Sequence, residues 1–124
     1  ITHVKEIAAG ETVSYGATLT ADRQTRVATL AVGYGDGYSR LLSNKAQVLV
    51  NGRRCRVLGR VCMDQIMADV TEAGDVRPGM AATLIGKDGG EFIGADELAG
   101  LEGTISYEVL LSISGRVPRV YTNN

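Results

Sequence analysis

Tyrosine is the residue type in this sequence that is best suited to acid–base chemistry. Five of the six aromatic residues are tyrosines, and three of them, Tyr15, Tyr34 and Tyr107, stand beside glycine or serine. A free phenol loses its proton at about pH 10, so it acts as a general acid or base at neutral pH only where a nearby cation lowers its pKa. Tyrosine is also common at half-buried positions where only the hydroxyl reaches water. The residue type alone therefore supports both a catalytic and a structural interpretation.

Other reaction types find little support in the sequence. A Ser-His-Asp hydrolase would need the single histidine, His3, which lies in an expected terminal strand, and no serine occupies a Gly-x-Ser-x-Gly turn. Gly33, Gly35 and Gly37 lack the spacing of a dinucleotide-binding loop. Four aspartates have no calcium-loop spacing and are expected in turns or in solvent: Asp64, Asp69, Asp75 and Asp88. With one histidine and two cysteines, no zinc site is predicted either.

The length and charge of the chain indicate one globular domain over residues 1–124. The 13 Lys and Arg residues against 14 Asp and Glu residues give a net charge of −1. Nucleic-acid binding needs a surplus of clustered positive charge, and a membrane span needs about 20 consecutive apolar residues, so neither is expected. Cys55 and Cys62 are too few for a secreted disulfide framework and are expected to be reduced. We therefore expect a cytoplasmic chain, and its start at Ile1 indicates part of a longer protein.

Short β-branched runs separated by glycine-rich turns predict a mostly β fold. The clearest segment is a hairpin, in which residues 48–50 and 54–58 flank Asn51-Gly52, the dipeptide that best tolerates positive φ at both central positions of a type I′ turn. Residues 26–32 predict another strand, which must give way to an irregular loop at residues 33–37. Many short strands with turns at nearly regular spacing are typical of a closed or half-closed barrel, and we expect a Greek-key-like β-barrel.

Helical periodicity extends over one segment only, residues 104–113. The apolar residues on one stripe of this helix are Ile105, Val109, Leu110 and Ile113. Residues 95–99 predict one helical turn, closed by Gly100. The sequence thus predicts a mostly β domain with one short helix near residues 104–113, and Tyr107 would lie near the start of that helix.

Five motifs follow one another along the chain. They are V-S-Y-G-A-T at residues 13–18, V-G-Y-G-D-G-Y at 32–38, G-R-V-C-M-D-Q at 59–65, I-S-Y-E-V at 105–109 and R-V-P-R at 116–119. In this order, and over essentially the whole chain, they resemble the C-terminal domain of bacterial alanine racemase. One departure is Gly35, where that family more commonly has alanine. The family pairs this mostly β domain with an N-terminal (β/α)₈ barrel, which holds pyridoxal 5′-phosphate on a lysine, and it works as a head-to-tail homodimer.

The resemblance implies a function for the parent protein and roles for three residues. The parent would interconvert L- and D-alanine by two-base proton transfer on the pyridoxal-phosphate aldimine and so supply D-alanine for peptidoglycan. Tyr15 would be the catalytic base on one face of the substrate, with the barrel lysine on the other. Met63 would offer its main-chain N–H to the substrate carboxylate. Tyr107 would donate its hydroxyl to the phosphate of the cofactor, which is held mainly by the barrel.

The same resemblance implies a substrate entryway lined by Tyr34, Arg40 and Arg60. A salt-bridged surface role is the alternative for both arginines. The implied partners are the N-terminal barrel, a second copy of the protein and a small amino acid, and the isolated chain is expected to be inactive without the barrel. Two other functions stay open. One is a serine or broad-specificity racemase, including the racemase domain of a membrane-anchored resistance protein, and the other is a non-catalytic β-barrel binding or assembly module.

Overall fold

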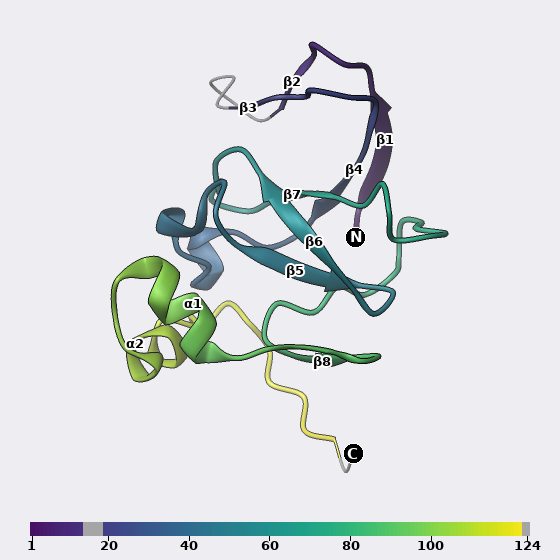
Figure 1. The fold of residues 1–124 in the computed structure, drawn as a ribbon. Helices are drawn as coiled ribbons and strands as arrows, with labels where there is room; N and C mark the ends of the chain where they lie inside the picture. Colours follow the sequence, from purple (N-terminus) through teal and green to yellow (C-terminus); the bar gives the residue numbers. More distant parts are fainter. Residues whose placement is uncertain (14–18, 123–124) are drawn as a thin grey trace.

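The structure, a computed structural model, describes residues 1–13 and 19–122 (Figure 1). The strands in this part of the chain are β1 (His3–Ile7), β2 (Thr12–Val13), β3 (Leu19–Thr20), β4 (Thr25–Leu30), β5 (Gln47–Val50), β6 (Arg53–Leu58), β7 (Ile66–Asp69), β8 (Gly86–Asp88) and β9 (Glu91–Ile93). The 3₁₀ helices are η1 (Tyr34–Asp36) and η2 (Arg40–Leu42), and the α-helices are α1 (Ala95–Glu102) and α2 (Ser106–Leu111). The expected mostly β class is confirmed.

The main sheet is antiparallel, with the strand order β1-β4-β7-β6-β5. Leu30 of β4 stands opposite Ile66 of β7, so the loop that follows β4 and the loop that precedes β7 leave from the same end of this pair. β2 pairs with β3 and β8 with β9 in two separate hairpins. A bridge between Leu49 and Thr83 ties the edge strand β5 to the chain that leads into β8. Within the described ranges, hydrogen bonds therefore form three separate sheets, and these sheets are not joined into one closed barrel.

The expected hairpin is confirmed, and the strand expected at residues 26–32 is β4, which ends two residues earlier, at Leu30. β5 and β6 are joined by Asn51 and Gly52, whose φ angles are 52° and 72°, the positive values that a type I′ turn requires. The Asn51 side-chain amide also donates to the carbonyls of Ala73 and Asp75, at 2.9 and 2.8 Å. The turn is thus fixed both by its own backbone and by its contact with the loop that follows β7.

The structure contains one more helix than the single one expected. α2 lies within residues 104–113 as expected, but the single turn expected at residues 95–99 is the eight-residue helix α1. α1 continues through Gly100 and ends at Gly103, whose φ of 76° is left-handed. Leu98 and Ala99 are buried in the core, and this packing outweighs the cost of about 1 kcal/mol that a glycine imposes on a helix interior.

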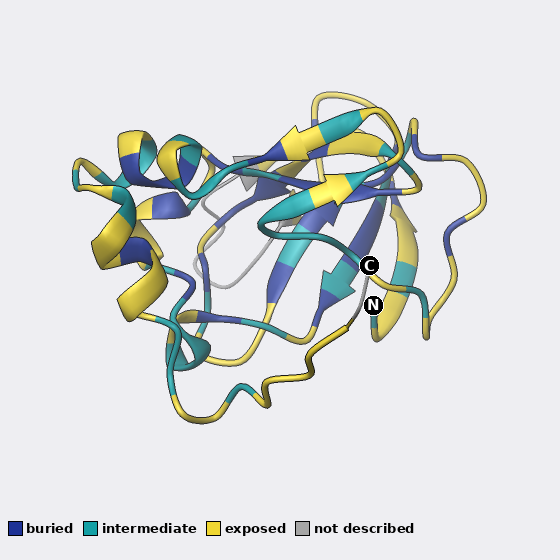
Figure 2. Cartoon of the chain, turned by 90° about the horizontal axis from the view of Figure 1, so that it is seen from below, coloured by how far each residue is buried: buried dark blue, intermediate teal, exposed yellow. Residues whose placement is uncertain are grey.

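Buried apolar side chains lie on both faces of the main sheet. Figure 2 shows buried residues along the strands and on the inner sides of the helices, while the outer turns and the C-terminal segment are exposed. The large fully buried side chains include Leu42, Leu49, Leu58, Ile66, Ile93 and Leu98. In β4, Ala28 belongs to the larger core cluster and Val27 to a smaller one, as expected for neighbours on opposite faces of a strand.

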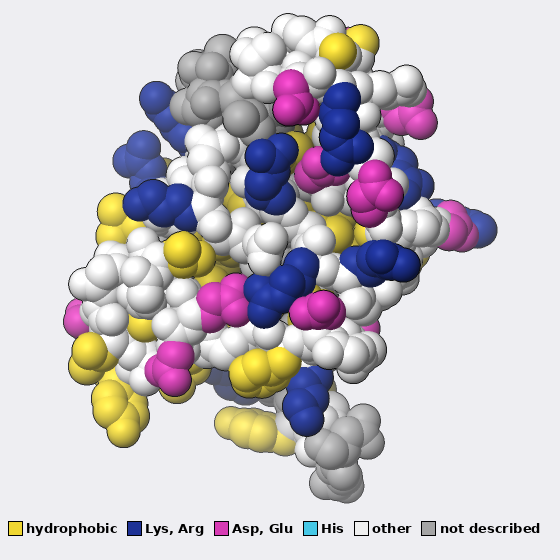
Figure 3. Space-filling model, in the orientation of Figure 1, with side chains coloured by type: hydrophobic (Ala, Val, Ile, Leu, Met, Phe, Trp, Pro, Cys, Tyr) yellow, Lys and Arg dark blue, Asp and Glu magenta, His cyan; other side chains and the backbone are white. Residues whose placement is uncertain are grey.

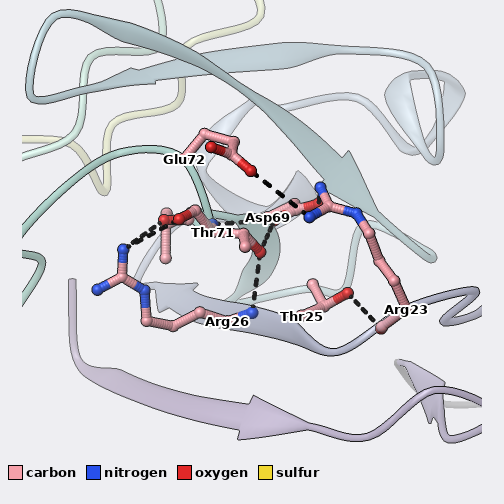
Figure 4. A network of polar contacts seen from close by, with 7 residues as sticks. Arg23, Thr25, Arg26, Asp69, Thr71 and Glu72 are labelled. Carbon is pink, nitrogen blue, oxygen red and sulfur yellow. Dashed lines mark hydrogen bonds and ion pairs between the residues drawn. The ribbon is translucent and has the colours of Figure 1, made fainter.

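A polar network closes the other end of the β4–β7 pair (Figure 4). The Arg26 N–H donates to the Thr71 hydroxyl at 3.0 Å, and the Thr71 hydroxyl donates to the Asp69 carboxylate at 2.5 Å. Asp69 also lies 3.5 Å from the guanidinium of Arg23. The Arg26 guanidinium donates to the Val70 carbonyl at 2.8 Å. These contacts hold the chain where it leaves β7, so the two loops at the opposite end project from a fixed frame.

A cavity of about 420 Å³ lies between the helices and residues 82–85. Most of its wall is apolar, with Leu42, Leu98 and Val109 among the lining residues. Tyr38 also lines it, and the buried Tyr38 hydroxyl has no hydrogen-bond partner within the described part of the chain. No helix in that part is long and apolar enough to span a bilayer.

Candidate functional site

Main-chain hydrogen bonds join the loop after β4 to the loop before β7. The Tyr34 N–H in η1 donates to the Cys62 carbonyl at 2.9 Å, and the Gly35 N–H donates to the Met63 carbonyl at 2.9 Å. A further hydrogen bond of 3.1 Å, from the Cys62 N–H to the Gln65 carbonyl, folds the second loop on itself. The structure therefore brings two of the predicted site residues, Tyr34 and Met63, side by side.

These contacts also fix the direction of the Met63 N–H. The Cys62 carbonyl and the Met63 N–H belong to one trans peptide group, in which the two point in opposite directions. Because the Cys62 carbonyl faces Tyr34, the Met63 N–H faces away from η1. No residue among 1–13 and 19–122 accepts a hydrogen bond from it, and Met63 is 48% exposed. The site thus contains an oriented main-chain donor that is suited to an anionic group.

Tyr34 is partly exposed and interacts with one of the two predicted entryway arginines. The guanidinium carbon of Arg40 lies 5.9 Å from the centre of the Tyr34 ring, within the range of a cation–π interaction. Arg40 is the first residue of η2, whose start is capped by the Ser39 hydroxyl, an acceptor for the Leu41 N–H at 3.1 Å. The two residues therefore form one exposed unit next to the Met63 loop.

The segment that follows α2 ties this helix to η1. The Ser112 hydroxyl donates to the Gly37 carbonyl at 3.1 Å, and the Ser114 hydroxyl donates to the Gly35 carbonyl at 3.0 Å. Tyr107 lies on α2 and is 72% exposed. Figure 3 shows hydrophobic side chains at the surface in the corner where the helices lie. The exposed apolar residues on and beside α2 are Ile105, Leu110 and Leu111.

Arg60 lies on the same loop as Met63. With Cys62, Gln65 and Thr12 of β2, it lines an open cavity of about 510 Å³. Tyr15 follows Thr12 by three positions in the sequence and lies outside the described residues. The structure thus groups Tyr34, Arg40 and Met63, connects Tyr107 to them through the end of α2, and puts Arg60 in the wall of the neighbouring cavity.

The sequence reasoning missed the charged residues that join these loops. The Arg116 guanidinium lies 2.5 Å from the Asp64 carboxylate and 3.5 Å from that of Asp36. The hydrogen bond to Asp64, followed by the charge of Asp36, raises the pKa of Arg116. Asp64 and Arg116 are 52 positions apart, so no local pattern in the sequence could have paired them. Among the described side chains, no group of three or more His, Cys, Asp or Glu residues is placed to hold a metal ion.

Fold and site together define a mostly antiparallel β domain that presents exposed aromatic groups and an oriented main-chain donor on neighbouring loops. The chain belongs to the family described as "Alanine racemase, C-terminal domain", whose model matches residues 1–121.

Full-length alanine racemases are among the relatives of this chain. It is 50% identical over 125 residues to the alanine racemase of Clostridium novyi. This alignment covers 100% of the present chain and 32% of the Clostridium protein. It superposes on the crystal structure of alanine racemase from Bacillus anthracis with bound L-Ala-P with a TM-score of 0.92 at 42% identity, covering 100% of this chain and 31% of the other. The crystal structure of alanine racemase from Bartonella henselae with covalently bound pyridoxal phosphate gives a TM-score of 0.87 at 32% identity. This superposition covers 96% of the present chain and 32% of the other. The chain therefore spans about a third of the length of the relatives it matches.

Proposed function

We propose that this chain is the C-terminal part of a pyridoxal-phosphate-dependent alanine racemase, an isomerase that interconverts L- and D-alanine and supplies D-alanine for peptidoglycan. The observation that best supports this function is the Met63 N–H, which has no acceptor in the described residues and is held in one direction by the contacts of Cys62 and Met63 with η1. A main-chain donor suits the carboxylate of an amino acid, because it binds the anion and makes no demand on the substrate side chain.

Tyr107 is the residue of this chain whose chemistry can be compared with what pyridoxal 5′-phosphate needs. The side chain is exposed on α2, so its O–H can donate to a phosphate oxygen of a group held by another part of the protein. One phenol is only part of a phosphate site, so the remaining donors and the cofactor lysine must come from the proposed N-terminal barrel. When bound, the cofactor supplies an electron sink that makes the α-proton of the amino acid acidic. Tyr107 is thus suited to contribute one hydrogen bond to the phosphate of a cofactor that the barrel holds.

The remaining roles follow from the family resemblance. Tyr15 exchanges the α-proton of the substrate through its hydroxyl oxygen, and the Met63 N–H holds the substrate carboxylate meanwhile. Tyr34, Arg40 and Arg60 line the route by which the amino acid arrives. The proposed partners are the barrel of the same protein and a second copy of the protein.

The proton-transfer role is tested with Tyr15→Phe in the full-length protein, with racemisation of L-alanine followed by circular dichroism. Loss of a general acid–base group is expected to slow racemisation by about 10²- to 10⁴-fold while the visible absorbance of the cofactor remains. Tyr121→Phe is the matched control, because it removes a phenol that is 92% exposed and has no assigned role. A Tyr15→Phe protein as fast as the Tyr121→Phe protein would remove Tyr15 from the mechanism.

The cofactor role is tested with Tyr107→Phe in the same protein. Loss of one hydrogen bond to a charged oxygen is expected to weaken cofactor retention about ten- to hundredfold, measured by dialysis and reconstitution. Unchanged retention would contradict the role of Tyr107.

Substrate assays separate the proposed function from its alternatives. L-Serine racemised as fast as L-alanine would favour a serine or broad-specificity racemase. A full-length protein without a cofactor-binding barrel would favour a non-catalytic binding or assembly module. The isolated 124-residue chain is expected to show no racemisation, because the cofactor lysine lies outside it.

A further inference from the structure

Arg116 stands at the meeting point of the three segments that carry the candidate site. One of its nitrogens, Nη2, lies 2.5 Å from Oδ1 of Asp64, the residue directly after Met63. Its Nε lies 3.5 Å from Oδ1 of Asp36 in η1. The second oxygen of Asp36 accepts the Gly33 N–H at 3.0 Å, so the same carboxylate closes the η1 loop. One guanidinium therefore bridges the loop of Tyr34 and the loop of Met63.

Gly35 allows the guanidinium to lie directly against the main chain. A Cβ at this position would be 2.1 Å from Nη1 of Arg116 and 3.0 Å from the Met63 carbonyl oxygen. The Gly35 carbonyl is held from the other side by the Ser114 hydroxyl, at 3.0 Å. The position of Arg116 is thus set by packing on Gly35 as well as by the two carboxylates.

We propose that Arg116 is a positioning residue for carboxylate binding, which fixes the Met63 loop against η1 and neutralises Asp36 of η1 and Asp64 of the Met63 loop. The inference rests on the proposed function, because it assigns the substrate carboxylate to that N–H. Its electrostatic part follows from charge alone. Carboxylates on the segments that form an anion site repel an incoming carboxylate unless a cation offsets them. Asp64 directly follows Met63 and Asp36 lies in η1, and in the described residues Arg116 is the cation paired with both.

The test uses the full-length protein and propionate, a carboxylate without an amino group, as a probe of this subsite. Propionate affinity is measured by titration calorimetry, and KM and kcat for alanine are measured in parallel. Arg116→Ala is expected to weaken propionate binding and raise KM roughly three- to tenfold, the range for one partly exposed ion pair, with a smaller change in kcat. Arg77→Ala is the matched control, because Arg77 forms an exposed pair with Asp75 at 2.7 Å and belongs to neither loop.

A second variant separates charge neutralisation from a general effect on folding. Adding Asp64→Asn to Arg116→Ala removes one of the unpaired carboxylates, so propionate affinity is expected to recover in part. Loss of affinity without recovery would overturn the electrostatic role. Should Arg116→Ala fail to fold, Arg116→Lys decides the matter, because an ammonium cannot reach both carboxylates as the guanidinium fork does. Propionate affinity equal to that of the unmodified protein would then overturn the proposal.

The proposed function and the role of Arg116 can be refuted separately. An unmodified protein that binds propionate but does not racemise alanine would refute the proposed function, while the Arg116 variants would still test the carboxylate subsite. An unmodified protein that racemises alanine, with KM and propionate affinity insensitive to Arg116→Ala, would refute the role of Arg116 alone.

Discussion

The Cα of Gly33 packs so closely on the loop before β7 that a Cβ would lie 2.1 Å from the carbonyl oxygen of Cys62. The φ of Gly33 is −158°, an extended value that any residue adopts, so the requirement for glycine is one of space. Gly33→Ala is therefore expected to force the two loops apart and to lower both thermal stability and racemisation by the full-length protein. Gly90→Ala is the control, because nothing lies within 4 Å of a Cβ at that position. Equal melting temperatures for the two variants would contradict this explanation.

The contribution of Met63 is expected to depend on its main chain. Met63→Leu keeps the N–H and a side chain of similar volume, so kcat/KM for alanine should stay within about threefold of the unmodified value. Replacement of residue 63 by the α-hydroxy acid of methionine exchanges the N–H for an ester oxygen. Loss of this hydrogen bond to an anion should raise KM about ten- to hundredfold. A larger loss of activity in Met63→Leu than in the ester variant would show that the Met63 thioether, and not its N–H, contributes to substrate binding.

The Tyr38 hydroxyl is buried without a partner in the described residues. Burial, and after it the charges of Glu102 and Glu97, raises the pKa of Tyr38 far above its usual value, so the phenol stays neutral. Tyr38→Phe removes a polar group that gains no hydrogen bond, and it is expected to increase the free energy of unfolding by about 1 kcal/mol. Urea unfolding of the 124-residue chain measures this, with the exposed Tyr121→Phe as control. A loss of stability would show that the hydroxyl has a partner.

The Arg54–Glu97 ion pair is expected to make the free energy of unfolding depend on pH in the acid range. The guanidinium contacts both Glu97 oxygens, at 2.8 and 3.0 Å, and its Nε lies 3.1 Å from Glu91. The hydrogen bonds from Arg54 hold the pKa of Glu97 below its usual value. The stabilisation is therefore present above the pKa of the unfolded chain, about 4.3, and is lost as the pH falls through the lower value of the folded chain.

Replacement of Glu97 tests this pH dependence directly. Glu97→Gln should cost about 1 kcal/mol at pH 7 and progressively less as the pH falls from 5 to 2, in urea titrations of the 124-residue chain. Asp75→Asn, in the exposed pair with Arg77, is the control and should show little effect. A difference between Glu97→Gln and the unmodified chain that does not change with pH would contradict the assignment.

Local chemistry made the strand framework predictable. Asn51-Gly52 specifies its own turn, and the run of β-branched residues before the glycines of residues 33–37 specifies a strand followed by a loop. Helix α1 was underestimated because the burial of Leu98 and Ala99, a property of the whole fold, decides whether the chain continues through Gly100. Propensity alone carries no information about that packing.

The candidate site was predictable only in its motif residues. Tyr34, Met63 and Tyr107 were named from resemblance, and the structure puts Tyr34 beside Met63 with α2 attached to them. The ion pairs of Arg116 with Asp36 and Asp64 join segments that are distant in the sequence. Such pairs arise only once the strands are in register, so a single sequence does not reveal them.

The Tyr34 loop and the Met63 loop are held together by hydrogen bonds between main-chain peptide groups. Side chains at positions 34 and 63 can be replaced by any residue except proline without removing any of the main-chain hydrogen bonds that hold the loops together. Glycines 33 and 37 tolerate no such change, since a Cβ on Gly37 would lie 2.3 Å from the Ser112 carbonyl oxygen. A library confined to positions 34 and 63 would therefore explore new substrate preferences on an intact scaffold, and directed evolution of this domain is best started there.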